Sequence, residues 1–470
     1  MNKEPKVFAH ASYVGTTGYN NHTRDFFRHL QKHISLKVRN FTIGKNFKWP
    51  NDEPHNGDHI KKIDKKLLTE QVLWTGDKTR GNFPIYKNYP NNFNHNINLV
   101  LAETDHYLFY DPYTGPKIAY NVWETTEQPD NFFNKLLEYD QIWVPSKWQA
   151  KCTIEQGADP DKVKVVPEGV DVNTFYPDDH VKHKDYDDGR FKFIIFGRWD
   201  YRKSTKEIIQ TFLDTFSKDE PVDLIVSIDN PYSGDGIETT EERLKVNGFD
   251  DDRIKIKHFP SRNDYIKYLK KGHVFLSCAR SEGWNLPLIE AMACGTPSIY
   301  SSDSGQMEFA EGKGLPVKIK SYQLANSKED MQFSNNAPGY FPEPDFDDLS
   351  KVMRDTYINY DKHKLKALTD SKIIHKEFNW DRVAEIGRDT LVDFLNNYQP
   401  PLDSNKINIT LTPDIKVEIT GDNNKLYNVQ FNDNGKIIFE DNISNNMWCG
   451  IPSDKLSETL SIQINEKPNI

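Results

Sequence analysis

The sequence predicts an α/β fold with two doubly wound units, followed by a small antiparallel β module. Short β-branched or aromatic runs alternate with amphipathic stretches in the first part of the chain, as they do in parallel sheets covered by helices. The same alternation starts again near residue 190, and beyond residue 403 the apolar residues follow a period of two. We therefore expect two α/β units, at residues 1–170 and 171–400, facing across a cleft, and a β-sandwich-like module at residues 403–470.

The first unit opens with a predicted strand at Lys6–Val14, a glycine turn at Gly15–Gly18 and a helix from about Tyr19. Further short apolar runs predict strands at Leu36–Phe41, Ile97–Ala102, Lys117–Trp123, Gln141–Pro145 and Lys162–Val166. Residues 44–96 interrupt the pattern, and Asp58–Leu73 within them predicts a helix. This segment is either a peripheral insertion or an acceptor-binding lid.

The second unit begins at the predicted strand Phe191–Phe196, after a polar stretch. Its other predicted strands are Asp223–Ile228, Ile254–His258, His273–Cys278 and Pro297–Tyr300. A helix is expected at Asp381–Leu395, and residues 381–398 are expected to pack back on the first unit. In the β module we expect strands at Ile407–Ile419, Tyr427–Phe431, Lys436–Phe439 and Leu460–Ile464, with Asn434-Gly435 as a hairpin turn.

Composition excludes several classes of protein. The 60 basic and 70 acidic residues give a net charge of −10, which disfavours general binding to nucleic acid or anionic lipid. Four scattered cysteines without CxxC spacing favour neither a disulfide scaffold nor structural zinc. No run approaches the roughly 20 apolar residues of a membrane-spanning helix, and the start MNKEPKVFAHAS has no apolar signal region. We therefore expect a cytoplasmic enzyme without an integral membrane segment.

The most informative motif is Ser281–Pro297, SEGWNLPLIEAMACGTP, which follows the predicted strand HVFLSCAR directly. Pro287 suits the first turn of a helix, and Gly295 suits its C-terminal cap. The amides at the start of this helix would face an anion. Glu282 precedes the helix and Glu290 is expected in its first turn, so the two carboxylates can reach different parts of one extended ligand.

Three other loops also follow predicted strands. They are Phe196–Lys203 (FGRWDYRK), Gly15–His22 (GTTGYNNH) and Tyr120–Pro129 (YNVWETTEQP). From the residues alone, the first is either an anion clamp or a solvated basic loop, and the second is either a phosphate-binding turn or a plain tight turn.

Together these motifs resemble retaining glycosyltransferases of the GT-B fold, in the large group usually called family 4. The resemblance covers about residues 5–398 and is most specific at the E-x7-E segment. It implies two Rossmann-like domains with the donor site between them. It also implies that Glu290 accepts hydrogen bonds from the ribose hydroxyls, and that Glu282 holds the donor sugar and stabilises its developing positive charge. The neighbouring donor-binding residues are then Gly283, Trp284, Asn285 and Leu286.

The same resemblance implies a clamp for the donor diphosphate. Arg198 and Lys203 fit its two cationic positions, with Arg202 as a further candidate. Such cations stabilise the leaving diphosphate without a metal. Gly18 would let the backbone approach the phosphates, and Ser204 stands where a glycine is common in the family.

One motif departs from the family. Many relatives carry a histidine and an acid where this chain has Trp123-Glu124. Glu124 is either a substrate-orienting or proton-handling group, or a partner of a nearby basic residue with Trp123 as ordinary core. His106 is a further candidate, although a lone histidine is more often structural. The acidic residues Asp185, Asp187 and Asp188 are expected to form a solvated turn rather than a metal site.

The resemblance implies transfer of a hexose or pentose from a nucleotide-diphosphate sugar, UDP favoured over GDP, to a hydroxyl acceptor with retention. The expected acceptor is a carbohydrate, or a lipid-linked or protein hydroxyl; a nucleic-acid acceptor has no support from the charge. No cofactor and no metal are expected. The alternatives are a nucleotide-sugar epimerase, a phosphorylase, or a sugar-binding or assembly protein with an inactive cleft. The β module is then either a structural appendage or a carbohydrate-binding unit that uses Trp448 and Tyr427.

Overall fold

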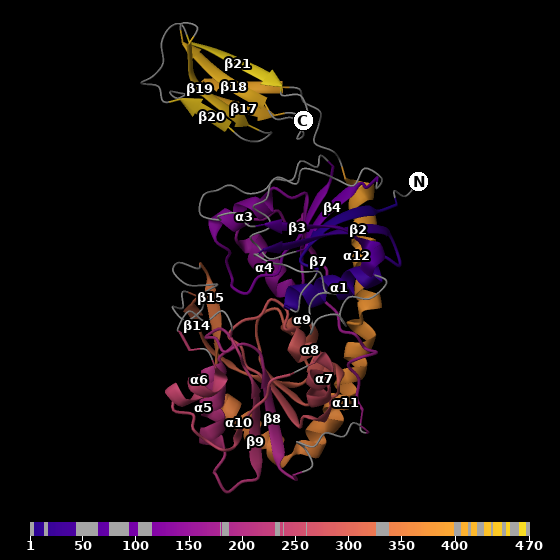
Figure 1. Ribbon diagram of the computed structural model, residues 1–470, viewed down its shortest axis with the longest axis vertical. Coiled ribbons are helices and arrows are strands. Elements are labelled where there is room, and N and C mark those ends of the chain that lie inside the picture. The colour runs from indigo at the N-terminus through magenta and orange to yellow at the C-terminus, as the bar shows by residue number, and fades with distance from the viewer. Residues whose placement is uncertain are drawn as a thin grey trace.

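The computed structural model describes most of both α/β units and the strands of the β module (Figure 1). The described residues are 4–13, 17–43, 64–74, 94–101, 115–178, 180, 188–230, 236–237, 239–259, 261–325 and 338–398, with the strands between residues 406 and 466. The predicted fold class is confirmed. The limits at residues 170 and 400 stay predictions.

Seven parallel strands form the sheet of the first unit, in the order β3-β2-β1-β4-β5-β6-β7. They are β1 Lys6–Ala11, β2 Ser35–Ile43, β3 Leu68–Trp74, β4 Ile97–Leu101, β5 Lys117–Tyr120, β6 Gln141–Val144 and β7 Val163–Val165. The helices between them are α1 Gly18–Leu30, α2 Asp64–Leu67, α3 Asp130–Leu137 and α4 Lys147–Glu155. The central strands are buried, which explains their nearly continuous apolar runs.

One predicted element of this unit is wrong. Of the helix predicted at Asp58–Leu73, residues 58–63 lie outside the described part of the chain, and only α2 is helical. From Leu68 onward the chain is β3, which pairs in parallel with β2 at the edge of the sheet. Hydrogen bonding to an existing sheet edge has therefore overridden a helix-like pattern.

Six parallel strands form the second sheet, in the order β10-β9-β8-β11-β12-β13. They are β8 Phe191–Phe196, β9 Val222–Ser227, β10 Ile254–Ile256, β11 Val274–Ser277, β12 Ser298–Ser301 and β13 Leu315–Val317. The helices are α5 Thr205–Thr215, α6 Thr240–Val246, α7 Arg262–Lys271, α8 Leu286–Ala293, α9 Met307–Ala310, α10 Phe346–Ile358 and α11 Tyr360–Glu377. The strand order reverses between β8 and β11, and the crevice beyond the carboxyl ends of such strands is where open α/β sheets bind ligands.

The last helix, α12 (Trp380–Asn397), returns to the first unit and packs along α1 (Figure 1). Its apolar side chains belong to the same core as β1 and α1. At Gly387 an added Cβ would lie 2.9 Å from the Phe26 ring, so a glycine permits this close packing. The chain thus crosses between the units twice, and the two crossings pair through Val170 N and Phe378 O at 2.8 Å.

An antiparallel hairpin, β14 (Ile319–Leu324) with β15 (Tyr340–Pro344), extends from the second unit toward the first (Figure 1). Phe341 is fully buried against Trp123 of the first unit. The amide of Tyr340 donates to Thr126 Oγ1 at 2.9 Å. The hairpin therefore contacts the loop that carries Glu124.

The β module consists of two three-stranded antiparallel sheets, in the orders β16-β17-β20 and β19-β18-β21. The strands are β16 Lys406–Leu411, β17 Ile415–Thr420, β18 Tyr427–Asp433, β19 Lys436–Ile443, β20 Trp448–Ile451 and β21 Leu460–Glu466. The predicted single strand at Ile407–Ile419 is in fact the pair β16–β17. Asp433 pairs with Lys436, which confirms a two-residue hairpin connection. Among the described helices of the whole chain, none combines the length and the apolar character needed to cross a bilayer.

Candidate active site

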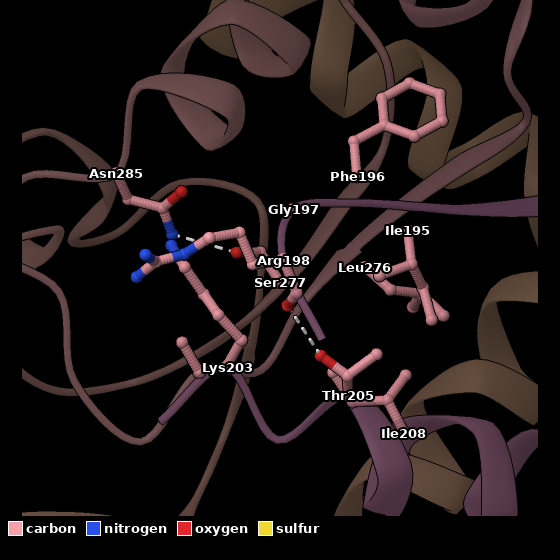
Figure 2. Close-up of a pocket in the computed structure, with 11 residues that line it drawn as sticks. Ile195, Phe196, Gly197, Arg198, Lys203, Thr205, Ile208, Leu276, Ser277 and Asn285 are labelled. Atoms are coloured by element: carbon pink, nitrogen blue, oxygen red, sulfur yellow. Dashed lines mark hydrogen bonds between the residues drawn. The ribbon is translucent and has the colours of Figure 1, made fainter. Parts of the chain in front are cut away.

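The loops after β8 and β11 meet at the point where the strand order reverses. They line a small pocket, bordered by Gly197, Arg198, Lys203, Ser277 and Asn285 among others. Figure 2 shows the Arg198 and Lys203 side chains on the same side of this pocket as Asn285. Two of the predicted cations therefore lie beside the start of the predicted anion-binding helix.

The Asp200 side chain contacts two other residues of the loop between β8 and α5. Its Oδ1 accepts from the Lys203 amide at 2.7 Å, and its Oδ2 lies 3.4 Å from Arg198 Nη2. Ser204, at the end of this loop, has a φ of 53°. That left-handed backbone favours glycine, which gives a physical reason for the glycine found here in the family.

Glu282 and Glu124 come from different units and share one arginine. Arg202 Nη1 donates to Glu282 Oε2 at 3.0 Å, and Arg202 Nη2 lies 3.1 Å from Glu124 Oε1. Lys203 Nζ pairs with the other oxygen of Glu282. Glu124 therefore pairs with a basic residue, as one alternative expected, and its position beside Glu282 also fits the other alternative, a group that orients substrate. Trp123 is buried in the core, and its Nε1 donates to Thr125 Oγ1 at 2.6 Å.

The environment moves the pKa values of these two carboxyls in opposite directions. Burial raises the pKa of Glu124 above its ordinary value, although the Arg202 guanidinium opposes this. Burial also acts to raise the pKa of Glu282, but the adjacent Lys203 ammonium and Arg202 guanidinium outweigh it and hold that pKa below its ordinary value. Glu282 is therefore the fixed anion of the pair, and Glu124 is the carboxyl closer to taking up a proton.

Glu290 lies in the second turn of α8, not in the first turn as predicted, because the helix begins at Leu286. Its Oε1 accepts from Arg262 Nη2 at 3.0 Å, and its Oε2 accepts from the Tyr265 hydroxyl. Burial raises the pKa of this carboxyl, with Arg262 opposing. Arg262 and Tyr265, both on α7, are functional candidates that the sequence analysis missed. Nothing in the sequence shows that α7 packs beside Glu290.

The start of α8 is built by Asn285. Its Oδ1 accepts from the Leu288 amide at 3.3 Å, while its Nδ2 donates to Ser277 Oγ and Gln306 Oε1. The Trp284 side chain is core, packed on Phe309 and Phe378, so this residue can meet a ligand only through its backbone. Leu286 is half-buried and approaches Gly18, where an added Cβ would lie 3.9 Å from Leu286 Cδ1. The N-terminal ends of α1 and α8 therefore face each other across the units.

Gly283 lies where the loop after β11 packs tightly against the first unit. A Cβ there would lie 2.5 Å from Val122 Cγ1 and 3.1 Å from Trp123 O. We expect Gly283→Ala to separate the two loops and to lower turnover at least about tenfold, since small misplacements at a site are costly. Steady-state kinetics checks this. The double variant Gly283→Ala with Val122→Ala should recover part of the loss, and full activity in the single variant would contradict the prediction.

Some predicted candidates lie elsewhere. Gly15, His106, Asp185 and Asp187 fall outside the described residues. Asp188 pairs with Lys192 at 2.5 Å. In the described part of the chain, no three or more His, Cys, Asp or Glu side chains are grouped so as to hold a metal ion.

Comparison with known proteins shows what the part of the chain that carries this site is similar to. Residues 178–327 match the family model described as Glycosyl transferases group 1, and this span contains Arg198, Lys203, Glu282 and Glu290. This match lies within the second α/β unit. The chain has the GT-B fold, as its similarity to solved structures shows. Sucrose-phosphate synthase from Thermosynechococcus elongatus has a TM-score of 0.60 at 14% identity, covering 84% of this chain and all of the other. HepE from Anabaena, solved with UDP-glucose, has a TM-score of 0.58 at 13% identity with the same coverage.

Curated proteins match shorter stretches of the chain. The gpi3 subunit of phosphatidylinositol N-acetylglucosaminyltransferase from Schizosaccharomyces pombe is 22% identical over 258 residues, which are 54% of this chain and 49% of that protein. A probable sucrose-phosphate synthase from Thermosipho melanesiensis is 29% identical over 157 residues, or 32% of this chain and 35% of that protein. The chain thus spans about half, or less, of the length of these curated relatives.

Proposed function

We propose that the protein is a retaining glycosyltransferase that moves a hexose or pentose from a nucleotide-diphosphate sugar to a hydroxyl acceptor. The observation that carries the proposal is the meeting of Arg198, Lys203 and Glu282 beside the start of α8, at the point where the strand order of the second sheet reverses. Cations and helix amides suit a diphosphate. A buried carboxylate beside them suits the positive charge of a sugar losing its leaving group.

The reaction begins as the bond between sugar C1 and the diphosphate oxygen lengthens. Arg198 and Lys203 take up the negative charge that collects on the diphosphate, so no metal or cofactor is needed for this step. Glu282 and Glu124 steady the cation-like sugar. The acceptor hydroxyl attacks C1 from the face that the diphosphate leaves, its proton passes to the departing diphosphate oxygen, and the anomeric configuration is kept.

Gly18 and the backbone from Gly283 to Leu286 would contact the diphosphate from the two facing helix ends. Glu290 would hold the ribose hydroxyls. We favour a UDP-sugar donor, supported by the solved UDP-glucose complex of HepE. We favour a carbohydrate or lipid-linked acceptor. The lipid-linked alternative is supported by the names of two relatives, phosphatidylinositol N-acetylglucosaminyltransferase and alpha-monoglucosyldiacylglycerol synthase. We also favour a cytoplasmic location.

The decisive experiment measures nucleoside diphosphate released from a panel of UDP- and GDP-sugars, with and without carbohydrate and lipid-linked acceptors. Release that depends on an acceptor, with an α-linked product from an α-linked donor, supports the proposal. Conversion of one UDP-sugar to another without an acceptor would indicate an epimerase. Sugar binding without turnover of any donor would indicate an inactive cleft.

The ribose role of Glu290 has its own test. We expect Glu290→Gln to weaken UDP binding roughly tenfold or more, because it removes charge-assisted hydrogen bonds to the ribose. Isothermal titration calorimetry with UDP and with 2′-deoxy-UDP checks this. The variant should lose less affinity for the deoxynucleotide than for UDP. Equal losses for the two nucleotides would show that Glu290 acts on the fold of α7 and α8 instead.

A further inference from the structure

Arg202 differs from the two clamp cations in where it lies. Its side chain is 3% exposed, whereas that of Arg198 is 37% exposed. Beyond the two carboxylates, its Nη1 donates to Ser281 O at 2.8 Å. The guanidinium is therefore surrounded by protein acceptors rather than open to the pocket.

The backbone around Arg202 is held just as firmly. Its carbonyl accepts from the Arg280 amide at 2.7 Å. The Arg280 side chain donates to Tyr201 O and, at 3.3 Å, to Ser204 Oγ, and it pairs with Glu343 of β15. The loop that carries Arg202 is thus fixed from β11 and from the β14–β15 hairpin, and its position is set before any ligand binds.

The two carboxylate oxygens of Glu124 differ in their contacts. Its Oε1 meets Arg202, whereas its Oε2 is buried and accepts no hydrogen bond from the described residues. A buried acceptor of this kind is costly unless something donates to it. A hydroxyl group of a sugar in the cleft has the chemistry to do so.

We propose that Arg202 is a positioning residue, which sets Glu124 of the first unit against Glu282 of the second and so leaves Glu124 Oε2 directed at a sugar hydroxyl when the units are closed. This inference rests on the proposed function. It assigns Arg202 to the carboxylates and not to the diphosphate. Only arginine offers a planar set of donors that can bond two carboxylates and a carbonyl together.

The first test separates positioning from phosphate binding. We expect Arg202→Met to lower kcat roughly 100-fold, the range for lost electrostatic organisation, and to leave the Kd for UDP within about threefold. Arg202→Lys should recover part of kcat. The matched control is Arg253→Met. Arg253 is also buried and pairs with an acidic residue, Asp251, but it precedes β10 and so lies at the amino ends of the strands, away from the site.

The second test is a double-mutant cycle. If Arg202 acts through Glu124, then adding Arg202→Met to Glu124→Gln should lower kcat by much less than it does in the wild type, because residues that act as a unit are not additive. The pH profile gives an independent readout. Glu124 faces Arg202, Glu282, Lys203 and Arg198, so removing Arg202 should move the acid limb of the profile to higher pH.

Three outcomes overturn the inference: a wild-type kcat in Arg202→Met, a rise in its Kd for UDP well beyond threefold, or an undiminished effect in the Glu124→Gln background. If Arg202→Met does not fold, Arg202→Lys carries the same cycle. Failure of the proposed function is distinguishable, because then the wild-type protein itself turns over no nucleotide sugar, and the inference falls with it.

Discussion

Arg198→Ala should lower kcat by about 100-fold to 1,000-fold while raising the Kd for UDP much less. The reason is that part of the negative charge on the diphosphate develops only during the reaction. In the bound donor each phosphate already carries its charge, whereas the bridging oxygen gains charge only as the bond to the sugar breaks. Arg198 lines the pocket, its side chain is half-exposed, and its Nη2 lies 3.4 Å from Asp200 Oδ2. We therefore expect its guanidinium to lie close to that oxygen when a donor is bound.

The matched control for this variant lies at the other end of the same strand. Arg190 precedes β8 and Arg198 follows it, and their side chains are 35% and 37% exposed. Arg190 pairs with Asp223 at 2.8 Å. Arg190→Ala should therefore match any general effect on the stability of the unit and leave kcat near the wild-type value. A wild-type kcat for Arg198→Ala would remove Arg198 from the proposed mechanism.

Much of the second unit could be predicted from sequence because its strands are buried on both faces. Phe191–Phe196 is predicted to the residue, since a run of aromatic and β-branched residues in such a position has no competing structure. Both ends of α8 could also be predicted, because Pro287 in its first turn and Gly295 just beyond its last residue act locally on the backbone. Where short-range preference and burial agree, the sequence alone suffices.

The elements that escaped prediction depend on contacts between distant residues. The β14–β15 hairpin pairs Leu324 with Tyr340, and both side chains are exposed, so neither periodicity nor burial reveals it. β3 is a strand because β2 offers an edge. Arg202 contacts Glu124, about 80 positions before it, and Glu282, about 80 positions after it. No spacing in the sequence indicates that these three residues meet.

The contact between His22 and Glu168 likewise depends on residues far apart in the sequence. It lies near the two crossings between the units. His22 ends the Gly15–His22 motif noted from the sequence, but its pairing with Glu168 was not predicted. His22 Nδ1 lies 3.5 Å from Glu168 Oε2, and both side chains are buried. The imidazole also stacks on Trp380 at the start of α12 and meets the Tyr120 ring edge-on. The pair therefore lies where the two crossings between the units come together.

This pair predicts how thermal stability depends on pH. Burial raises the pKa of Glu168 to about 8 and lowers the pKa of His22 to about 3. The raised carboxyl pKa gives stability that is complete below the unfolded value of 4.5 and is lost as pH rises to 8. The lowered imidazole pKa gives stability that is complete above 6.5 and is lost as pH falls to 3. Between pH 4.5 and 6.5 the two slopes cancel.

Above pH 6.5 only the Glu168 slope remains, because there the folded state keeps a proton that the unfolded state has released. We expect the stability to fall by about 1.4 kcal/mol per pH unit, or about 2 kcal/mol between pH 6.5 and 8. Glu168→Gln keeps the shape and removes the titration, so its melting temperature should fall less over this interval in calorimetry. Parallel melting curves for the two proteins would mean that Glu168 is already ionised in the folded state, with its proton held by His22 instead.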